Sequence, residues 1–198
     1  MALQQLKDGN RRFVEGNSNA KLTTSSTRRC ELIGEQNPSA IILGCSDSRA
    51  PAEIIFDQGL GELFVIRVAG NIVAPSQVGS VEYAVEQTGA RLAVVLGHTG
   101  CGAVEATVAQ LERAATERSP NLQSIVERIR PSVESLLEMD SDIDRETLLR
   151  RAVRANVRTS VDHLRHGSEI LERFIADDFL IVIGAEYSLE TGLVEFFE

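Results

Sequence analysis

The side chains of this sequence that could do chemistry follow two short apolar runs. "IILG" is followed by Cys45, Asp47 and Arg49 at alternate positions, and "VVLG" is followed by His98 and Cys101. Two cysteines and one histidine are ligand types that zinc prefers, and three protein ligands leave the fourth tetrahedral position open for water or a substrate. The pattern therefore favours a catalytic metal site, because structural zinc sites are usually closed by four protein ligands.

The predicted strands that precede these residues indicate how Cys45, His98 and Cys101 could come together. Ligands of open parallel sheets bind at the carboxyl ends of the strands, so the three metal ligands converge if the first and third strands are neighbours. Glycines at positions 97, 100 and 102 would let the backbone fold tightly, so that His98 and Cys101 point at one atom. Three apolar runs of strand length alternate with helical patterns, which is typical of a parallel sheet: Ala40 to Gly44, Leu63 to Val68 and Leu92 to Gly97.

The rest of the chain completes an α/β fold. Ala2 to Glu15 has the spacing of an amphipathic helix, and a polar connector follows over residues 16–29. Near the end, "FLIVIGAEY" indicates a fourth strand, and a turn at Glu190 to Gly192 leads to a fifth strand in hairpin with it. We predict a doubly wound, mostly parallel sheet of four strands with an antiparallel edge strand, flanking helices and an N-terminal helical arm.

Length and composition indicate one globular domain. The chain has 198 residues, of which 43% are hydrophobic and 25% charged, close to the average for globular proteins. We expect residues 1–198 to form one domain, with an arm and connector over 1–38 and an α/β core over 39–198. The core would carry a helical insert at about 104–177, before the last parallel strand, and its last part, Glu146 to Ala176, has one continuous helical pattern.

Charge and cysteine content limit which partners the protein is expected to bind and in which cellular compartment we expect it. A net charge of −9 argues against binding to nucleic acid or to an anionic membrane surface, because both need a basic face. No window approaches the roughly 20 apolar residues of a membrane span, and the start has no apolar signal core. Three cysteines are a poor disulfide framework, so we expect a cytoplasmic protein with reduced thiols.

The two motifs also resemble a known family. "CSDSR" followed downstream by "GHTGCGA" is similar to the β class of carbonic anhydrases, of the bacterial type, and the resemblance runs through "GELFVIRVAGN" to "GAEYSLETG". It implies reversible hydration of carbon dioxide to bicarbonate and a proton. It also implies one zinc ion per chain, held by Cys45, His98 and Cys101, with Asp47 and Arg49 as a catalytic pair.

The roles that the resemblance implies agree with metal-ion chemistry. Zinc lowers the pKa of a bound water from 15.7 to roughly 7 in histidine-ligated enzymes, and two thiolates should weaken this effect. Asp47 can orient the resulting hydroxide, and Arg49 keeps the Asp47 carboxylate ionised by charge-assisted pairing. Without Arg49, Asp47 could swing onto the zinc as a fourth ligand, which is the closed state of some family members.

The resemblance separates two subsets of the family. One subset is regulated by bicarbonate held by a tryptophan, an arginine and a tyrosine. Arg67 and Tyr187 fall at two of these positions, but Ile42 replaces the tryptophan, and the chain contains no Trp. We therefore do not expect that bicarbonate pocket.

The other subset lines its substrate cleft with residues that this chain shares. Gln36 matches a glutamine that donates a hydrogen bond to the substrate, while Phe64 and Tyr83 match aromatic residues supplied across a dimer interface. Ala69 replaces a valine, which suggests a slightly wider cleft. The family implies a homodimer or a tetramer of dimers, in which the opening helix embraces the partner.

Several alternatives stay open at this stage. The same scaffold could hydrolyse carbon disulfide or carbonyl sulfide, or it could be an inactive zinc-binding structural protein. Asp47 and Arg49 would otherwise be a surface ion pair, and "GHTGCG" a phosphate loop. We interpret His163 and His166 as part of a solvated helix face, and Cys30 as a packing residue.

Overall fold

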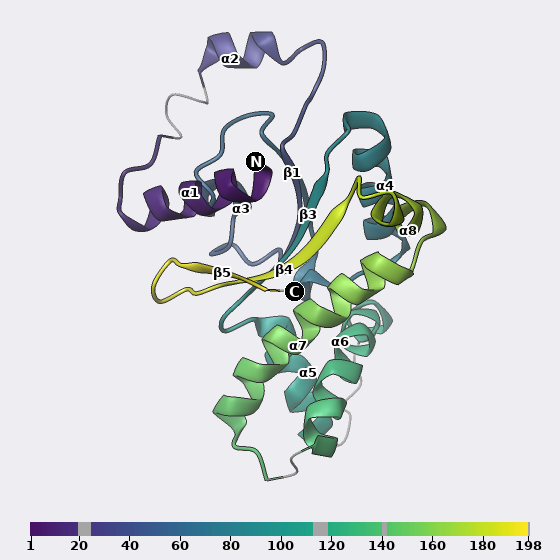
Figure 1. The fold of residues 1–198 in the computed structure, drawn as a ribbon. Helices are drawn as coiled ribbons and strands as arrows, with labels where there is room; N and C mark the ends of the chain where they lie inside the picture. Colours follow the sequence, from purple (N-terminus) through teal and green to yellow (C-terminus); the bar gives the residue numbers. More distant parts are fainter. Residues whose placement is uncertain (20–24, 113–118, 140–141, 198) are drawn as a thin grey trace.

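The computed structural model describes residues 1–19, 25–112, 119–139 and 142–197. It contains one five-stranded sheet in the order β2-β1-β3-β4-β5. Figure 1 shows β1, β3 and β4 side by side in the middle of the molecule. The first four strands are parallel and β5 is antiparallel to β4, which confirms the predicted sheet and its antiparallel edge. The strands are β1 Ala40–Gly44, β2 Leu63–Arg67, β3 Leu92–His98, β4 Ile181–Tyr187 and β5 Val194–Phe197.

Helices cover both faces of the sheet because the strands are apolar on both sides. Ala40 and Ile42 of β1 pack into one core cluster, whereas Ile41 and Leu43 pack into another on the opposite face. This alternation follows from the two-residue period of a strand. The first face packs against α1 (Ala2–Val14) and α3 (Ala52–Ile55), and the second against α4 (Pro75–Thr88), α7 (Arg145–His166) and α8 (Glu169–Ala176).

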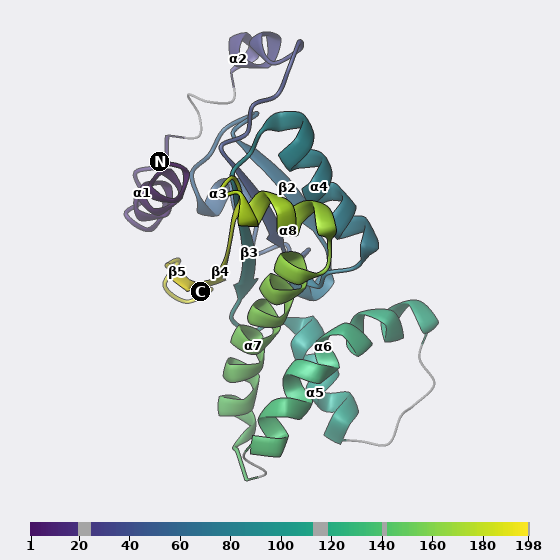
Figure 2. The ribbon, with the colours of Figure 1, turned by 45° about the vertical axis from the view of Figure 1, so that its right-hand side comes forward.

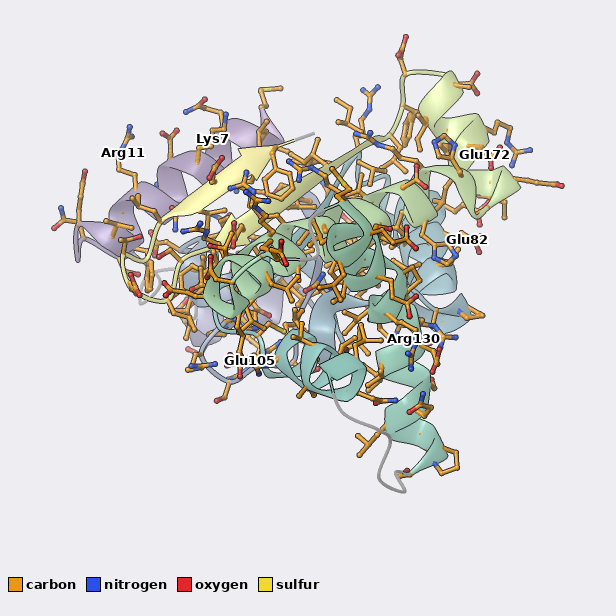
Figure 3. All side chains as sticks on the ribbon, turned by 90° about the horizontal axis from the view of Figure 1, so that it is seen from below. Lys7, Arg11, Glu82, Glu105, Arg130 and Glu172 are labelled. Atoms are coloured by element: carbon orange, nitrogen blue, oxygen red, sulfur yellow. The ribbon has the colours of Figure 1, made fainter. Side chains whose placement is uncertain are left out.

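The helical insert lies between β3 and β4, as predicted. It comprises α5 (Gly102–Glu112), α6 (Pro120–Met139), α7 and α8, and α5 to α7 extend beyond the sheet (Figure 2). The apolar faces of α5, α6 and α7 share a third core cluster with Cys45 and Cys101. Charged side chains such as Glu105 and Glu172 are exposed at the surface (Figure 3). The insert therefore supplies the wall behind both cysteines.

Two local predictions were wrong. Within the predicted polar connector, residues 20–24 lie outside the described residues, but Ser26–Glu31 forms helix α2, because the Ser25 side chain caps it by accepting a hydrogen bond from the Arg28 amide. The helical pattern from residue 146 to 176 predicted one helix, but it is broken after His166. Ser168 caps the new helix α8 by accepting a hydrogen bond from the Leu171 amide.

Helix α1 packs on its own chain. Leu6 is fully buried, and the buried Asn10 amide donates to the Gly192 carbonyl at 2.8 Å while its oxygen accepts from the Val194 amide at 2.9 Å. Arg12 forms an ion pair with the buried carboxylate of Asp57. The resemblance led us to expect this helix to embrace a partner. In the single chain, its buried contacts are with α3 and the β4–β5 hairpin, and its contact with a partner stays a prediction.

The close contact of α1 with the core predicts that a substitution of Gly9 lowers stability. A Cβ there would lie 1.8 Å from the Phe56 carbonyl oxygen, whereas a Cβ at Gly79 of α4 meets nothing within 4 Å. We expect Gly9→Ala to lower the free energy of unfolding by about 1–3 kcal/mol through overpacking. Gly79→Ala should raise it by about 0.5–1 kcal/mol, because alanine favours the helix. Urea unfolding measures both, and equal effects of the two substitutions would contradict the packing described here.

Candidate metal centre

Cys45, His98 and Cys101 meet at the carboxyl ends of β1 and β3. These strands are neighbours, and their register pairs Gly44 with Leu96, so the residues that follow them leave the sheet side by side. The three ligand atoms lie within 4.8 Å of one another, and all three residues are buried. The two sulfur atoms are 4.0 Å apart, close to the about 3.8 Å expected for two sulfurs on a tetrahedral zinc.

The His98 ring is held in the orientation that a metal requires. Its Nδ1 lies 2.9 Å from the Thr99 carbonyl oxygen, which accepts its hydrogen. The other nitrogen, Nε2, is buried without a hydrogen-bond partner among the described residues. A buried nitrogen with no partner is costly in an apolar site, and a metal ion would satisfy it. The donor set therefore fits zinc, whose histidine ligands commonly donate their second N–H to a carbonyl or carboxylate.

The glycines around His98 have separate roles. Gly100 has a φ of +62°, a backbone conformation that favours glycine, and it turns the chain from His98 toward Cys101. A Cβ at Gly97 would lie 2.5 Å from the Val157 side chain, so glycine permits the close approach of α7 to β3. A Cβ at Gly102 meets nothing within 4 Å. Positions 97 and 100 therefore need glycine in this structure, whereas position 102 does not.

The two thiols differ in acidity because they share a hydrogen bond. Cys101 lies beside Cys45 and lowers the pKa of the Cys45 thiol, while the pKa of Cys101 is raised by the same contact and by burial. The amide of Gly70 also donates to the Cys45 sulfur at 3.3 Å. Burial lowers the pKa of His98, but the Cys45 sulfur beside it outweighs burial and the net pKa is raised. One negative charge is thus already favoured at this site, and a divalent cation would favour a second.

Asp47 and Arg49 form a bidentate pair next to these ligands. Arg49 donates from Nε to Oδ1 at 3.0 Å and from Nη2 to Oδ2 at 2.8 Å. These bonds hold the pKa of Asp47 well below its usual range, so the carboxylate is ionised at neutral pH. Asp47 Oδ2 lies 3.8 Å from His98 Nε2, and Arg49 also donates to the Gly100 carbonyl at 3.2 Å. The pair therefore joins the two ligand-bearing loops.

Arg67 has a contact that the sequence did not indicate. It stands at the end of β2 opposite Gly44, and its guanidinium donates to the Cys45 carbonyl at 3.0 Å and to the Asp47 carbonyl at 2.6 Å. The sequence resemblance places Arg67 only at the position of a regulatory residue. Its hydrogen bonds to the two carbonyls could have been expected only once β1 and β2 are known to pair, because Arg67 then stands beside the end of β1.

The other residues of the regulatory trio are buried. Ile42 is fully buried within β1, and Tyr187 is 6% exposed at the end of β4, where its ring packs at 6.5 Å from that of Phe13.

The expected substrate-cleft residues are divided between the two ends of the sheet. Ala69 opens a 3₁₀ turn, Ala69–Asn71, which contacts Cys45 through Gly70. Phe64 instead pairs with Ile41, four residues before Cys45 and therefore about 13 Å from it along the strand. Its ring lies 6.1 Å from that of Tyr83. Gln36 is exposed before the amino end of β1. One chain alone therefore brings only Ala69 to the metal ligands.

The remaining candidates stay outside the site. Among the described residues, Cys45, His98 and Cys101 form the one group of three or more potential metal ligands. His163 and His166 are exposed, as predicted for a solvated helix face, and His166 lies 3.6 Å from Asp162. Cys30 is exposed on α2, so the prediction of a packing role was wrong. No helix of the described part is long and apolar enough to cross a membrane.

Comparison with known proteins identifies relatives along almost the whole chain. A family model described as carbonic anhydrase matches residues 40–194. A carbonic anhydrase of Mycolicibacterium smegmatis is 39% identical over 194 residues, which is 98% of this chain and 91% of the relative. Carbonic anhydrase 2 of Mycobacterium tuberculosis is 39% identical over 191 residues, 96% of this chain and 89% of the relative.

Solved structures of β-carbonic anhydrases are also similar to this chain. The β-carbonic anhydrase CcaA superposes with a TM-score of 0.80 at 26% identity, covering 99% of this chain and 87% of CcaA. A Coccomyxa β-carbonic anhydrase in complex with acetazolamide has a TM-score of 0.78 at 25% identity, with 96% and 83% of the two chains covered.

The ligand geometry predicts the metal content of variants. We expect the purified protein to contain about one zinc ion per chain and Cys101→Ser to lose it, because the loss of one of three protein ligands opens the site. Cys30→Ser is the matched control and should keep its zinc, since Cys30 lies outside the group. Elemental analysis after gel filtration measures both, and full zinc retention by Cys101→Ser would contradict the assignment.

Proposed function

This chain belongs to the β class of the carbonic anhydrase family, and from that membership we propose that it hydrates carbon dioxide reversibly at the site of Cys45, His98 and Cys101. The reaction yields bicarbonate and a proton, which is the activity of the family. The observation that supports this site most directly is the buried His98 Nε2, which lies near the two sulfurs and has no hydrogen-bond partner among the described residues.

The three ligands suit the reaction chemically. A bound zinc ion supplies Lewis acidity, which lowers the pKa of water toward neutrality and makes hydroxide available. The two sulfurs match the charge of the ion, and the Thr99 carbonyl holds His98 in the tautomer that leaves Nε2 free to bind. Because two thiolates weaken the acidity of the ion, we expect activity to rise as the pH is increased.

Asp47 orients the attacking oxygen in this proposal. Its Oδ2 lies 3.8 Å from His98 Nε2, so a nucleophile held at the three ligands would be within reach of this carboxylate. An ionised carboxylate can only accept hydrogen bonds, so it holds the O–H of the nucleophile and directs a lone pair at the carbon. Arg49 keeps the pKa of Asp47 low, so Asp47 stays in this form across the working pH range.

The Asp47–Arg49 pair also decides whether the site is open. Asp47 could become a fourth ligand only by rotating its carboxylate, which would break the two hydrogen bonds from Arg49. The Gly100 carbonyl and the Arg49 amide oppose this movement, since they hold the guanidinium and the carboxylate in place. We infer that the paired arrangement is the open, active one.

A homodimer, alone or within a tetramer, would complete the cleft. β2 is an edge strand, with β1 on one side and no strand on the other among the described residues. If two β2 edges pair about a two-fold axis, they run antiparallel, and the amino end of one lies beside the carboxyl end of the other. Phe64, Tyr83 and Gln36 of one chain would then approach the metal ligands of its partner. Tyr83 is 52% exposed in the single chain, which leaves it free for this contact.

The proposal treats residues 1–198 as one domain, because the arm buries Leu6 and Asn10 against the core. Free thiols at the metal centre suit a reducing compartment such as the cytoplasm.

Hydrolysis of carbon disulfide or carbonyl sulfide would need the same ligands, and comparing turnover of the three gases separates these activities. An inactive structural zinc protein would have no use for the bidentate Asp47–Arg49 pair.

Replacing Asp47 tests the catalytic role. We expect Asp47→Asn to keep its zinc but to lose about 100-fold in kcat/KM for carbon dioxide hydration, because the amide can donate to the nucleophile and misdirect it. Stopped-flow hydration assays across pH on zinc-assayed protein measure the effect. Asp162→Asn, at an exposed carboxylate, is the control and should be fully active. Full activity of Asp47→Asn would contradict the role assigned to this residue.

Mixed oligomers test whether the cleft is shared. Asp47→Asn and Gln36→Ala should each be inactive alone, but co-refolded in equal amounts they should recover about a quarter of wild-type activity. Random pairing makes half of the dimers mixed, and one of the two sites in each then carries neither substitution. No recovery, despite exchange of subunits shown by mass spectrometry, would place Gln36 outside the site of the partner.

A further inference from the structure

Helix α7 carries two buried polar side chains that bind the backbone of the turn at Gly70 and Asn71, next to Cys45. Asn156 is 1% exposed and Ser160 is 4% exposed. They lie one turn apart and so share one face of the helix. Asn156 donates from Nδ2 to the Gly70 carbonyl at 2.7 Å, and Ser160 donates from Oγ to the Asn71 carbonyl at 3.0 Å.

These two acceptors belong to a turn with an unusual backbone. Gly70 has a φ of +71° and Asn71 a φ of +43°, so two consecutive residues adopt the left-handed region. For Asn71 this conformation costs free energy, and it persists only where the surroundings hold it. The turn is also closely packed, since a Cβ at Gly70 would lie 2.7 Å from the Ile129 side chain of α6 and 3.0 Å from Ala103 of α5.

The turn ends on a metal ligand. The Gly70 amide donates to the Cys45 sulfur at 3.3 Å, and the carbonyl of the same residue accepts from Asn156. A chain of hydrogen bonds therefore runs from α7, through one glycine, to Cys45. Residues 70 and 156 are far apart in sequence, so the contact exists only in the folded protein.

We propose that Asn156 and Ser160 are positioning residues that fix the Gly70 N–H against the Cys45 sulfur and thereby set the metal affinity of the site. The inference rests on the proposed zinc-binding role of Cys45. A hydrogen bond to a thiolate stabilises the anion and fixes the direction of its lone pairs, and groups behind metal ligands commonly orient them in this way. The helical insert thus acts on the chemistry of the site as well as on its burial.

Two serine substitutions provide a matched test. Ser160→Ala removes the hydroxyl that donates to the Asn71 carbonyl, while Ser132→Ala removes an equally buried hydroxyl whose hydrogen bond is with Thr159 at 2.9 Å. Asn156→Leu removes the contact to Gly70 at similar volume. The readouts are zinc affinity by chelator competition, the sulfur-to-metal charge-transfer bands of the cobalt-substituted protein, and thermal unfolding.

We expect Asn156→Leu to bind zinc about 10- to 100-fold more weakly, the range seen when groups behind a ligand are removed. Ser160→Ala should change affinity in the same direction by a smaller factor. In both variants the cobalt bands should move to longer wavelength, because the sulfur lone pair loses its hydrogen bond. Ser132→Ala should match the wild type in zinc affinity and cobalt spectrum, even where its melting temperature falls.

Two results would overturn the inference. One is wild-type zinc affinity and cobalt bands in Ser160→Ala, which decides the question if Asn156→Leu does not fold. The other is an equal loss of affinity in Ser132→Ala, which would show a general effect of destabilisation. A wild-type protein that binds no zinc would instead refute the proposed function on which the inference depends.

Discussion

The parallel pairing of β1 with β2 on one side and β3 on the other is the constraint on which the site depends. It places the segments that follow three strands at one edge of the sheet: the Cys45 loop, the turn at Gly70, and the loop from His98 to Cys101. Each segment is short and is held by the next, through the Arg49 bond to Gly100 and the Gly70 bond to Cys45. No single loop forms the metal centre.

The charges at this edge are arranged so that little is left unbalanced. Two thiolates offset a divalent cation, and Asp47 is offset by the guanidinium of Arg49. Burying unpaired charges would be costly, and a large net charge would order water where carbon dioxide, which is uncharged, has to enter. Arg67 adds a third interaction, since its guanidinium binds the carbonyls of Cys45 and Asp47. Arginines thus hold both the Asp47 side chain and the backbone of the loop that follows β1.

Much of the fold and the whole metal-ligand set could be predicted from sequence because their signals are local. Buried strands are continuous apolar runs, and Cys45, His98 and Cys101 directly follow two of them. The break between α7 and α8 was missed because Gly167 and Ser168 stand within a continuing helical pattern. The roles of Asn156 and Ser160 could not be predicted, because a polar residue on an Arg-rich helix is ordinarily solvated. Only the packing of α7 over β3 buries them.

The edge strand β2 would serve two sites at once in the proposed dimer. Its carboxyl end carries Arg67, which holds the loop after β1 of the same chain, and its amino end carries Phe64, about 13 Å along the strand from Cys45 of that chain. Such a strand cannot shift its register in the sheet without disturbing both centres, since a slip by one residue turns each side chain to the opposite face. In that dimer, the geometry of metal binding and the geometry of subunit pairing would be coupled through the five residues of β2.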